Sequence, residues 1–145
     1  MDNDDSSDTT VIEQLENEIG FSNDLASAFV RARGRCEYCG ADLLMSRQGY
    51  AIAEIDHLLP RSKFSELSDI KQNHVLSCST CNGTKKDWSP LKEGETDEQM
   101  LEGKNRSKLI LRASKYIADK METYDEDWRK ATRILHRVWW EESPE

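Results

Sequence analysis

Two C-x2-C pairs set the strongest constraint on how this chain can fold. Cys36 and Cys39 form the first pair, Cys78 and Cys81 form the second, and together they are all four cysteines of the 145 residues. Four thiolates suit the tetrahedral coordination that zinc prefers. A shared zinc ion would close the 38-residue loop 40–77 and so contribute to folding. A site with four cysteine ligands has no open position, so we expect this zinc to be structural.

The same cysteines are also compatible with two disulfides, an iron–sulfur cluster or redox C-x2-C chemistry. Several features favour zinc. The chain begins with an acidic, polar segment, the reverse of a secretory signal, and no apolar run approaches the length of a membrane span. We therefore expect a reducing, cytoplasmic location, where paired cysteines more often bind metal than form disulfides. No βαβ pattern of the thioredoxin type surrounds either pair.

The acidity of the chain is concentrated near its start. The formal net charge is −8, from 20 Lys and Arg and 28 Asp and Glu. Residues 1–30 hold eight acidic and no basic side chains (−8), residues 31–90 hold nine basic and seven acidic ones (+2), and residues 91–145 hold eleven basic and thirteen acidic ones (−2). The segment with the cysteines is thus slightly basic, which allows local contacts with phosphate. Tight, non-specific DNA binding by this chain alone is less expected.

The pattern of polar and apolar residues divides the chain into four parts. Residues 1–10 are acidic and polar and predict a disordered tail. Residues 11–90 predict two helices followed by a core with two short strands and a short helix. Residues 91–103 are acidic and contain glycine, which indicates a linker, and residues 104–145 predict an extension of two helices. The predicted fold class is α+β.

A second group of polar residues lies between and just after the cysteine pairs. Asp56 and His57 follow the strand predicted at residues 50–56, Asn73 precedes the third cysteine by five residues, and Asn82 follows the fourth cysteine directly. With the cysteine pairs, this pattern closely resembles the HNH endonuclease family over about residues 30–90. The resemblance implies a small zinc-stapled ββα-metal core, of treble-clef-like type, flanked by N- and C-terminal helices.

The resemblance also implies a role for each of these residues in a nuclease that cuts DNA. His57 would be the general base that takes a proton from water. Asp56 and Asn82 would hold a catalytic Mg²⁺ or Mn²⁺ ion, and Asn73 would hydrogen-bond across the loop and fix His57. The last family position is often histidine, whereas here it is Asn82, as in HNN variants. An amide oxygen is a harder ligand than imidazole, which favours Mg²⁺ or Mn²⁺ over zinc.

Basic side chains near this cluster are candidates for contacts with the DNA backbone. Arg61, Lys63 and Lys85 are the residues we expect to bind phosphate. Each assignment has a structural alternative. Lysine on a short helix is usually solvated, Asn82 alone would be a helix cap, and an isolated histidine is more often a hydrogen-bonded residue than a base.

Function and partners beyond cleavage follow from weaker signals. A non-catalytic zinc module that binds nucleic acid or protein is the alternative, although it would not need Asp56, His57, Asn73 and Asn82 together. The run C-N-G-T-K-K-D-W-S-P is similar to family members that act beside an ATPase in antiviral defence. A stripe with Trp128, Leu135, Val138 and Trp139 indicates an interface with such a protein partner or with a second copy of the chain.

Overall fold

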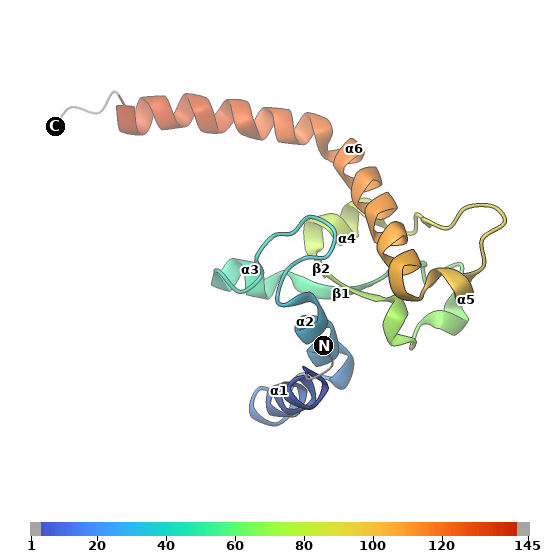
Figure 1. Ribbon diagram of the computed structural model, residues 1–145. Coiled ribbons are helices and arrows are strands. Elements are labelled where there is room, and N and C mark those ends of the chain that lie inside the picture. Colours follow the sequence, from blue (N-terminus) through green and yellow to red (C-terminus); the bar gives the residue numbers. More distant parts are fainter. Residues whose placement is uncertain (1–3, 142–145) are drawn as a thin grey trace.

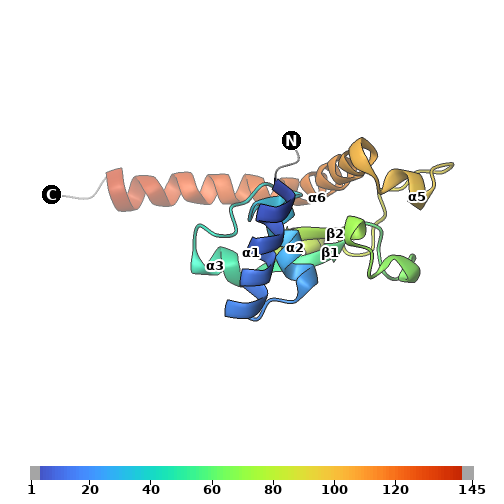
Figure 2. The same cartoon turned by 60° about the horizontal axis from the view of Figure 1, so that its bottom comes forward.

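A computed structural model describes residues 4–141 of the chain, with α1 and α2 side by side and a long C-terminal helix that projects from the body of the protein (Figures 1 and 2). The helices and strands are α1 (Asp4–Glu18), α2 (Asn23–Ala32), α3 (Arg47–Ala51), β1 (Ala53–His57), β2 (His74–Cys78), α4 (Ser79–Lys85), α5 (Asp97–Met100) and α6 (Gly103–His136). Two 3-10 turns, Ser65–Leu67 and Lys71–Asn73, lie between the strands, and a wider turn, Arg137–Glu141, ends the described chain.

The two strands form an antiparallel sheet, which confirms the α+β class. Ala53 pairs with Cys78 at one end of the ladder and His57 pairs with His74 at the other. The register therefore fixes one cysteine and one candidate catalytic histidine at opposite ends of the same strand pair. The first strand starts later than predicted from residues 50–56, because the side chain of Ser46 caps a helical turn over Arg47–Ala51.

The core lies where the sheet meets helices α2, α4 and α6. Leu58 and Leu59 at the end of β1 and Val75 and Leu76 in β2 are fully buried. The buried face of α6 completes this core with residues that recur at helical spacing, namely Leu109, Ala113 and Ile117. The second of the two helices predicted before the core is present as α2, with the Ser22 hydroxyl accepting a hydrogen bond from the Leu25 amide at 3.1 Å.

The prediction of a disordered tail over residues 1–10 is wrong for the part that the structure describes, since α1 begins at Asp4. Acidic side chains are favoured near a helix N-terminus, where the macrodipole attracts negative charge. Asp8 also lies 3.4 Å from Arg33, and Thr10 donates to the carbonyl of Ser6. Residues 1–3 lie outside the described residues.

The segment predicted as a linker, residues 91–103, is instead attached to the core. Met100 and Leu101 are buried there, and Thr96 caps the short helix α5. Glu95 makes a two-pronged ion pair with Arg112 of α6, at 2.7 and 2.9 Å. Arg112 holds the pKa of Glu95 at about 2, well below its usual value. Two apolar residues are enough to anchor so short a segment. The rest of it is polar, and this composition suggested a linker.

The two helices predicted for residues 104–145 are one continuous helix as far as His136. Residues 118–127 contain neither glycine nor proline, so nothing in the sequence interrupts the backbone hydrogen bonds. Residues 142–145 lie outside the described part of the chain. No described helix combines the length and the apolar character needed to cross a membrane.

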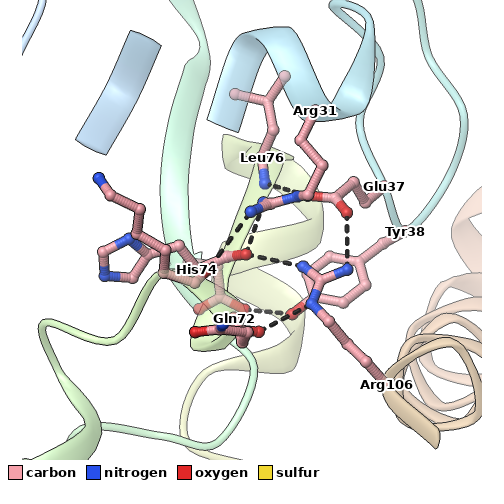
Figure 3. A network of polar contacts seen from close by, with 9 residues as sticks. Arg31, Glu37, Tyr38, Gln72, His74, Leu76 and Arg106 are labelled. Atoms are coloured by element: carbon pink, nitrogen blue, oxygen red, sulfur yellow. Dashed lines mark hydrogen bonds and ion pairs between the residues drawn. The ribbon is translucent and has the colours of Figure 1, made fainter. Parts of the chain in front are cut away.

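A polar network ties α6 and α2 to the first cysteine pair (Figure 3). Glu37, which lies between Cys36 and Cys39, accepts from Arg31 at 2.8 Å and from Arg106 at 3.3 Å. Both arginines also donate to the carbonyl of His74, at 2.6 and 2.8 Å. The guanidinium groups thus join two helices to the turn that carries two of the cysteines.

We expect Arg106→Ala to lower the free energy of unfolding of the zinc-loaded protein by about 2 kcal/mol, because it removes one charge-assisted hydrogen bond to the largely buried Glu37 carboxylate and two to the carbonyls of Gln72 and His74. Urea denaturation followed by circular dichroism measures the change. Lys108→Ala, an exposed position of the same helix, is the control and should leave the midpoint within error. Equal losses in both variants would contradict the assigned role of Arg106.

Candidate nuclease site

The four cysteines come together although 38 residues separate the two pairs. All four Sγ atoms lie within 4.8 Å of one another, and Cys39 Sγ is 4.0 Å from Cys78 Sγ. Sulfurs around a tetrahedral zinc lie about 3.8 Å apart, given a Zn–S bond of about 2.3 Å. The sulfur separations therefore fit a shared ion. Cys36, Cys78 and Cys81 are buried and Cys39 is exposed.

Local structure on each side of the cluster explains this convergence. The first pair occupies a turn after α2, closed by a bond from the Gly40 amide to the Cys36 carbonyl at 2.8 Å. The second pair spans the junction of β2 and α4, where Cys78 is the N-cap and its sulfur accepts from the Cys81 amide at 3.4 Å. The sheet brings the two turns together.

Electrostatics within the cluster favour a bound cation. A hydrogen bond from Cys39 is the main reason that the pKa of Cys36 is lowered, and Cys36 in turn is the main reason that the pKa of Cys81 is raised. The pKa of Cys78 is lowered to about 7. Without a cation the four thiols thus do not ionise alike, whereas zinc binds all four sulfurs as thiolates.

Asp56 faces the interior on the strand that leads to His57. Its Oδ2 atom accepts a hydrogen bond from the Tyr38 hydroxyl at 2.6 Å and lies 3.3 Å from Lys85 Nζ. Burial, followed by the charge of Asp56, raises the pKa of Tyr38 well above its usual value. Both contacts use Oδ2, so they leave Oδ1 as the oxygen available to an ion.

Lys85 corrects one of the expected phosphate contacts. Its side chain is fully buried, and Nζ donates to the carbonyl of His57 at 3.0 Å in addition to its ion pair with Asp56. Burial is the main reason that the pKa of Lys85 is lowered. A lysine on a short helix is usually exposed to solvent. On α4, Lys85 instead points inward, because the buried carboxylate of Asp56 on β1 pairs with it. Arg61 and Lys63 are exposed, as a phosphate contact requires.

His57 is half-buried at the end of β1 and held through one ring nitrogen. Its Nε2 atom lies 3.0 Å from the carbonyl oxygen of Ser68. A carbonyl oxygen only accepts hydrogen bonds, so Nε2 carries the proton and Nδ1 has the lone pair. This tautomer leaves a nitrogen that can accept a proton.

Asn73 spans the base of the loop that follows His57. The side chain is fully buried, accepts from the Leu59 amide at 2.7 Å and donates to the Leu59 carbonyl at 3.0 Å. Its backbone carbonyl also accepts from the Leu58 amide at 2.8 Å. Asn73 therefore fixes the backbone next to His57, rather than contacting the imidazole itself.

Asn82 lies on α4 and contacts a residue that the sequence reasoning missed. Its amide nitrogen donates to Glu54 Oε1 at 2.7 Å, which leaves the Asn82 oxygen outside this bond. Glu54 and Asp56 share one face of β1, since side chains alternate along a strand. The same face meets α4, where Asn82 and Lys85 are one turn apart. Because Glu54 lies two residues before Asp56 on a predicted strand, the sequence could have placed both side chains on the same face.

His74, which pairs with His57 in the sheet, lies in the interior. It is buried, its Nε2 donates to the Ser68 carbonyl at 2.7 Å, and its Nδ1 has no hydrogen-bond partner. The rings of His57 and His74 meet edge to face, with centroids 5.4 Å apart. The antiparallel register places these two histidines opposite each other.

We expect the purified protein to carry about one equivalent of zinc per chain. Cys78→Ser should lose the metal and unfold at lower temperature, because zinc binding is coupled to folding. Mass spectrometry with elemental detection after dialysis measures the content, and Ser79→Ala, beside the cluster, is the control. A folded wild-type protein without bound metal would exclude this site.

Comparison with known proteins agrees with this geometry. Residues 36–87 match the family model described as HNH endonuclease, a range that contains both cysteine pairs, Asp56, His57 and Asn82. No curated protein and no solved structure matches the chain. The segment from the first cysteine pair to just past the end of α4 is therefore similar to the HNH endonuclease family.

Proposed function

We propose that this protein is a metal-dependent endonuclease that hydrolyses phosphodiester bonds of DNA. The observation that carries the proposal is the contact between His57 Nε2 and the Ser68 carbonyl within the matched HNH segment. Nε2 is committed to the Ser68 carbonyl, so Nδ1 is left to take a proton from the attacking water. Asn73 holds the adjacent backbone, which keeps the ring in place during the reaction.

The residues expected to hold a divalent ion fit that task. Asp56 Oδ1 and the Asn82 amide oxygen are both outside the hydrogen bonds that fix their side chains. Carboxylate and amide oxygens are the ligands that Mg²⁺ and Mn²⁺ prefer. Such an ion would supply a Lewis acid for the phosphate and its leaving oxygen. Arg61 and Lys63 are the exposed cations proposed to position the DNA backbone.

One observation favours the alternative of a non-catalytic zinc module. The Asp56 carboxylate already has two buried partners, Tyr38 and Lys85, which would suffice for a purely structural role. Cleavage assays separate the two functions directly. A role in antiviral defence, in a reducing cytoplasm and beside a partner such as an ATPase, rests on the sequence resemblance alone and stays a proposal.

His57→Ala is expected to reduce cleavage of supercoiled plasmid DNA by about 10²–10⁴-fold, the usual contribution of a general base. Zinc content and the circular dichroism spectrum should not change. His136→Ala, on the exposed end of α6, is the matched control and should cut normally. Undiminished cleavage by folded, zinc-loaded His57→Ala would remove this residue from the mechanism.

Cleavage is expected to require Mg²⁺ or Mn²⁺ and to stop with EDTA before the structural zinc is lost. Asn82→Ala should raise the ion concentration for half-maximal activity by about tenfold or more, since it removes an oxygen ligand. Titration of Mn²⁺ by isothermal calorimetry provides a readout independent of activity. The control is Asn105→Ala, an asparagine bonded to Gln99 outside the site. Wild-type affinity for Mn²⁺ in Asn82→Ala would show that this residue is not a ligand.

A further inference from the structure

Glu54 is an acidic side chain at the candidate site that has no part in the proposed reaction. It lies half-buried on β1, and its hydrogen bond to Asn82 joins this strand to α4. A second contact, from Lys85 to Asp56, joins the same strand to the same helix one turn further on. In each contact the carboxylate uses one oxygen, Oε1 of Glu54 at 2.7 Å and Oδ2 of Asp56 at 3.3 Å. Strand and helix thus meet through two matched polar pairs.

The two carboxylates differ in the partner that α4 gives them. Asp56 is paired with an ammonium group. Among the residues whose side chains the structure describes, no Lys, Arg or His forms an ion pair with Glu54, whose partner is a neutral amide. Two carboxylates and one ammonium leave a formal charge of −1 on this face, which favours a cation beside it.

The amide group of Asn82 has two ends of similar size and opposite hydrogen-bonding character. The nitrogen end has two donor hydrogens, whereas the oxygen end accepts. Mg²⁺ and Mn²⁺ bind oxygen ligands. A half-turn of the amide would exchange the two ends and present N–H groups to the ion. Asn82 can therefore serve as a ligand only when its orientation is fixed.

Glu54 supplies what fixes this orientation. An ionised carboxylate accepts hydrogen bonds and cannot donate them, so the Asn82 nitrogen must face it. The reverse orientation would bring the amide oxygen against a carboxylate oxygen, with no proton between them and a half-buried acceptor left unpaired. A hydrogen bond to an ionised group is about twice as strong as a neutral one. The oxygen of Asn82 is thereby turned away from Glu54.

We propose that Glu54 is a positioning residue for the divalent ion, which acts by holding the Asn82 amide with its oxygen left for the ion. Each of the two side chains proposed as ligands is then held by a partner from the other element, Asp56 by Lys85 and Asn82 by Glu54. Hydrogen-bond partners of metal ligands typically contribute about 10–100-fold to metal affinity. This inference rests on the proposed function, because it concerns the same ion.

A double-mutant cycle on Mn²⁺ affinity tests the role of Glu54. The dissociation constant is measured for zinc-loaded wild-type protein, Glu54→Ala, Asn82→Ala and the double variant, by electron paramagnetic resonance of free Mn²⁺, which requires no cleavage. Glu54→Ala should raise the constant by about 10–100-fold in the wild-type background. In the Asn82→Ala background the same change should cost at least about fivefold less, because the two residues act as a unit.

The cycle separates positioning from charge. Loss of the Glu54 charge weakens cation binding equally in both backgrounds, so this contribution cancels. Equal losses in the two backgrounds would overturn the proposal, as would wild-type affinity in Glu54→Ala. Glu93→Ala removes the same charge at an exposed position and should leave the constant unchanged.

Two further measurements keep the outcome decisive. Glu54→Val also lacks an acceptor oxygen and suits a strand better than alanine, so it should repeat the result of Glu54→Ala in a folded protein. Zinc content and circular dichroism confirm the fold of each variant. If wild-type protein binds no Mn²⁺, or Asn82→Ala binds it equally well, the ion site of the proposed function is refuted and this inference with it. If Asn82→Ala weakens binding and Glu54→Ala does not, only the positioning role is refuted.

Discussion

The convergence of four sulfur atoms is the constraint on which the rest of this structure depends. The loop between the cysteine pairs contains β1, His57 and Asn73, so every residue proposed for catalysis except Asn82 lies inside the segment that the sulfurs close. The sheet has only two strands, and a strand pair of this size is marginally stable alone. A metal held by both cysteine pairs would compensate for the small core, and one of its ligands, Cys78, also caps α4.

Two residues between Cys36 and Cys39 connect this cluster to different parts of the protein. Glu37 accepts hydrogen bonds from Arg31 of α2 and Arg106 of α6, so it holds both helices at the turn. Tyr38 donates to Asp56 at 2.6 Å, and its carbonyl accepts from Ser114 of α6 at 2.8 Å. Metal ligation, helix packing and the position of the candidate ion ligand are therefore coupled through one tight turn. A zinc ion held by the four cysteines would stabilise all three, although the proposed chemistry does not use it.

The sequence was sufficient to predict features that depend on residues close together along the chain. The cysteine cluster, the strand leading to His57 and the two helices before the core follow from residue type and short distances along the chain, and the structure contains all of them. It was insufficient where a distant partner decides the outcome. The residues around Lys85 in sequence suggest an exposed side chain. It is buried because Asp56, far away in sequence, pairs with it. Residues 91–103 looked like a linker because composition does not reveal that Met100 and Leu101 reach the core.

The two histidines on the strand pair share a hydrogen-bond partner but differ in burial. His57 and His74 face each other across the sheet, and both donate Nε2–H to the same carbonyl of Ser68, so each has its lone pair on Nδ1. For His74 that nitrogen is buried without a partner, and the residue is 3% exposed. Water hardly reaches it, whereas His57 is half-buried and open to solvent. Only His57 thus combines a fixed tautomer with access to water, which the role of general base requires.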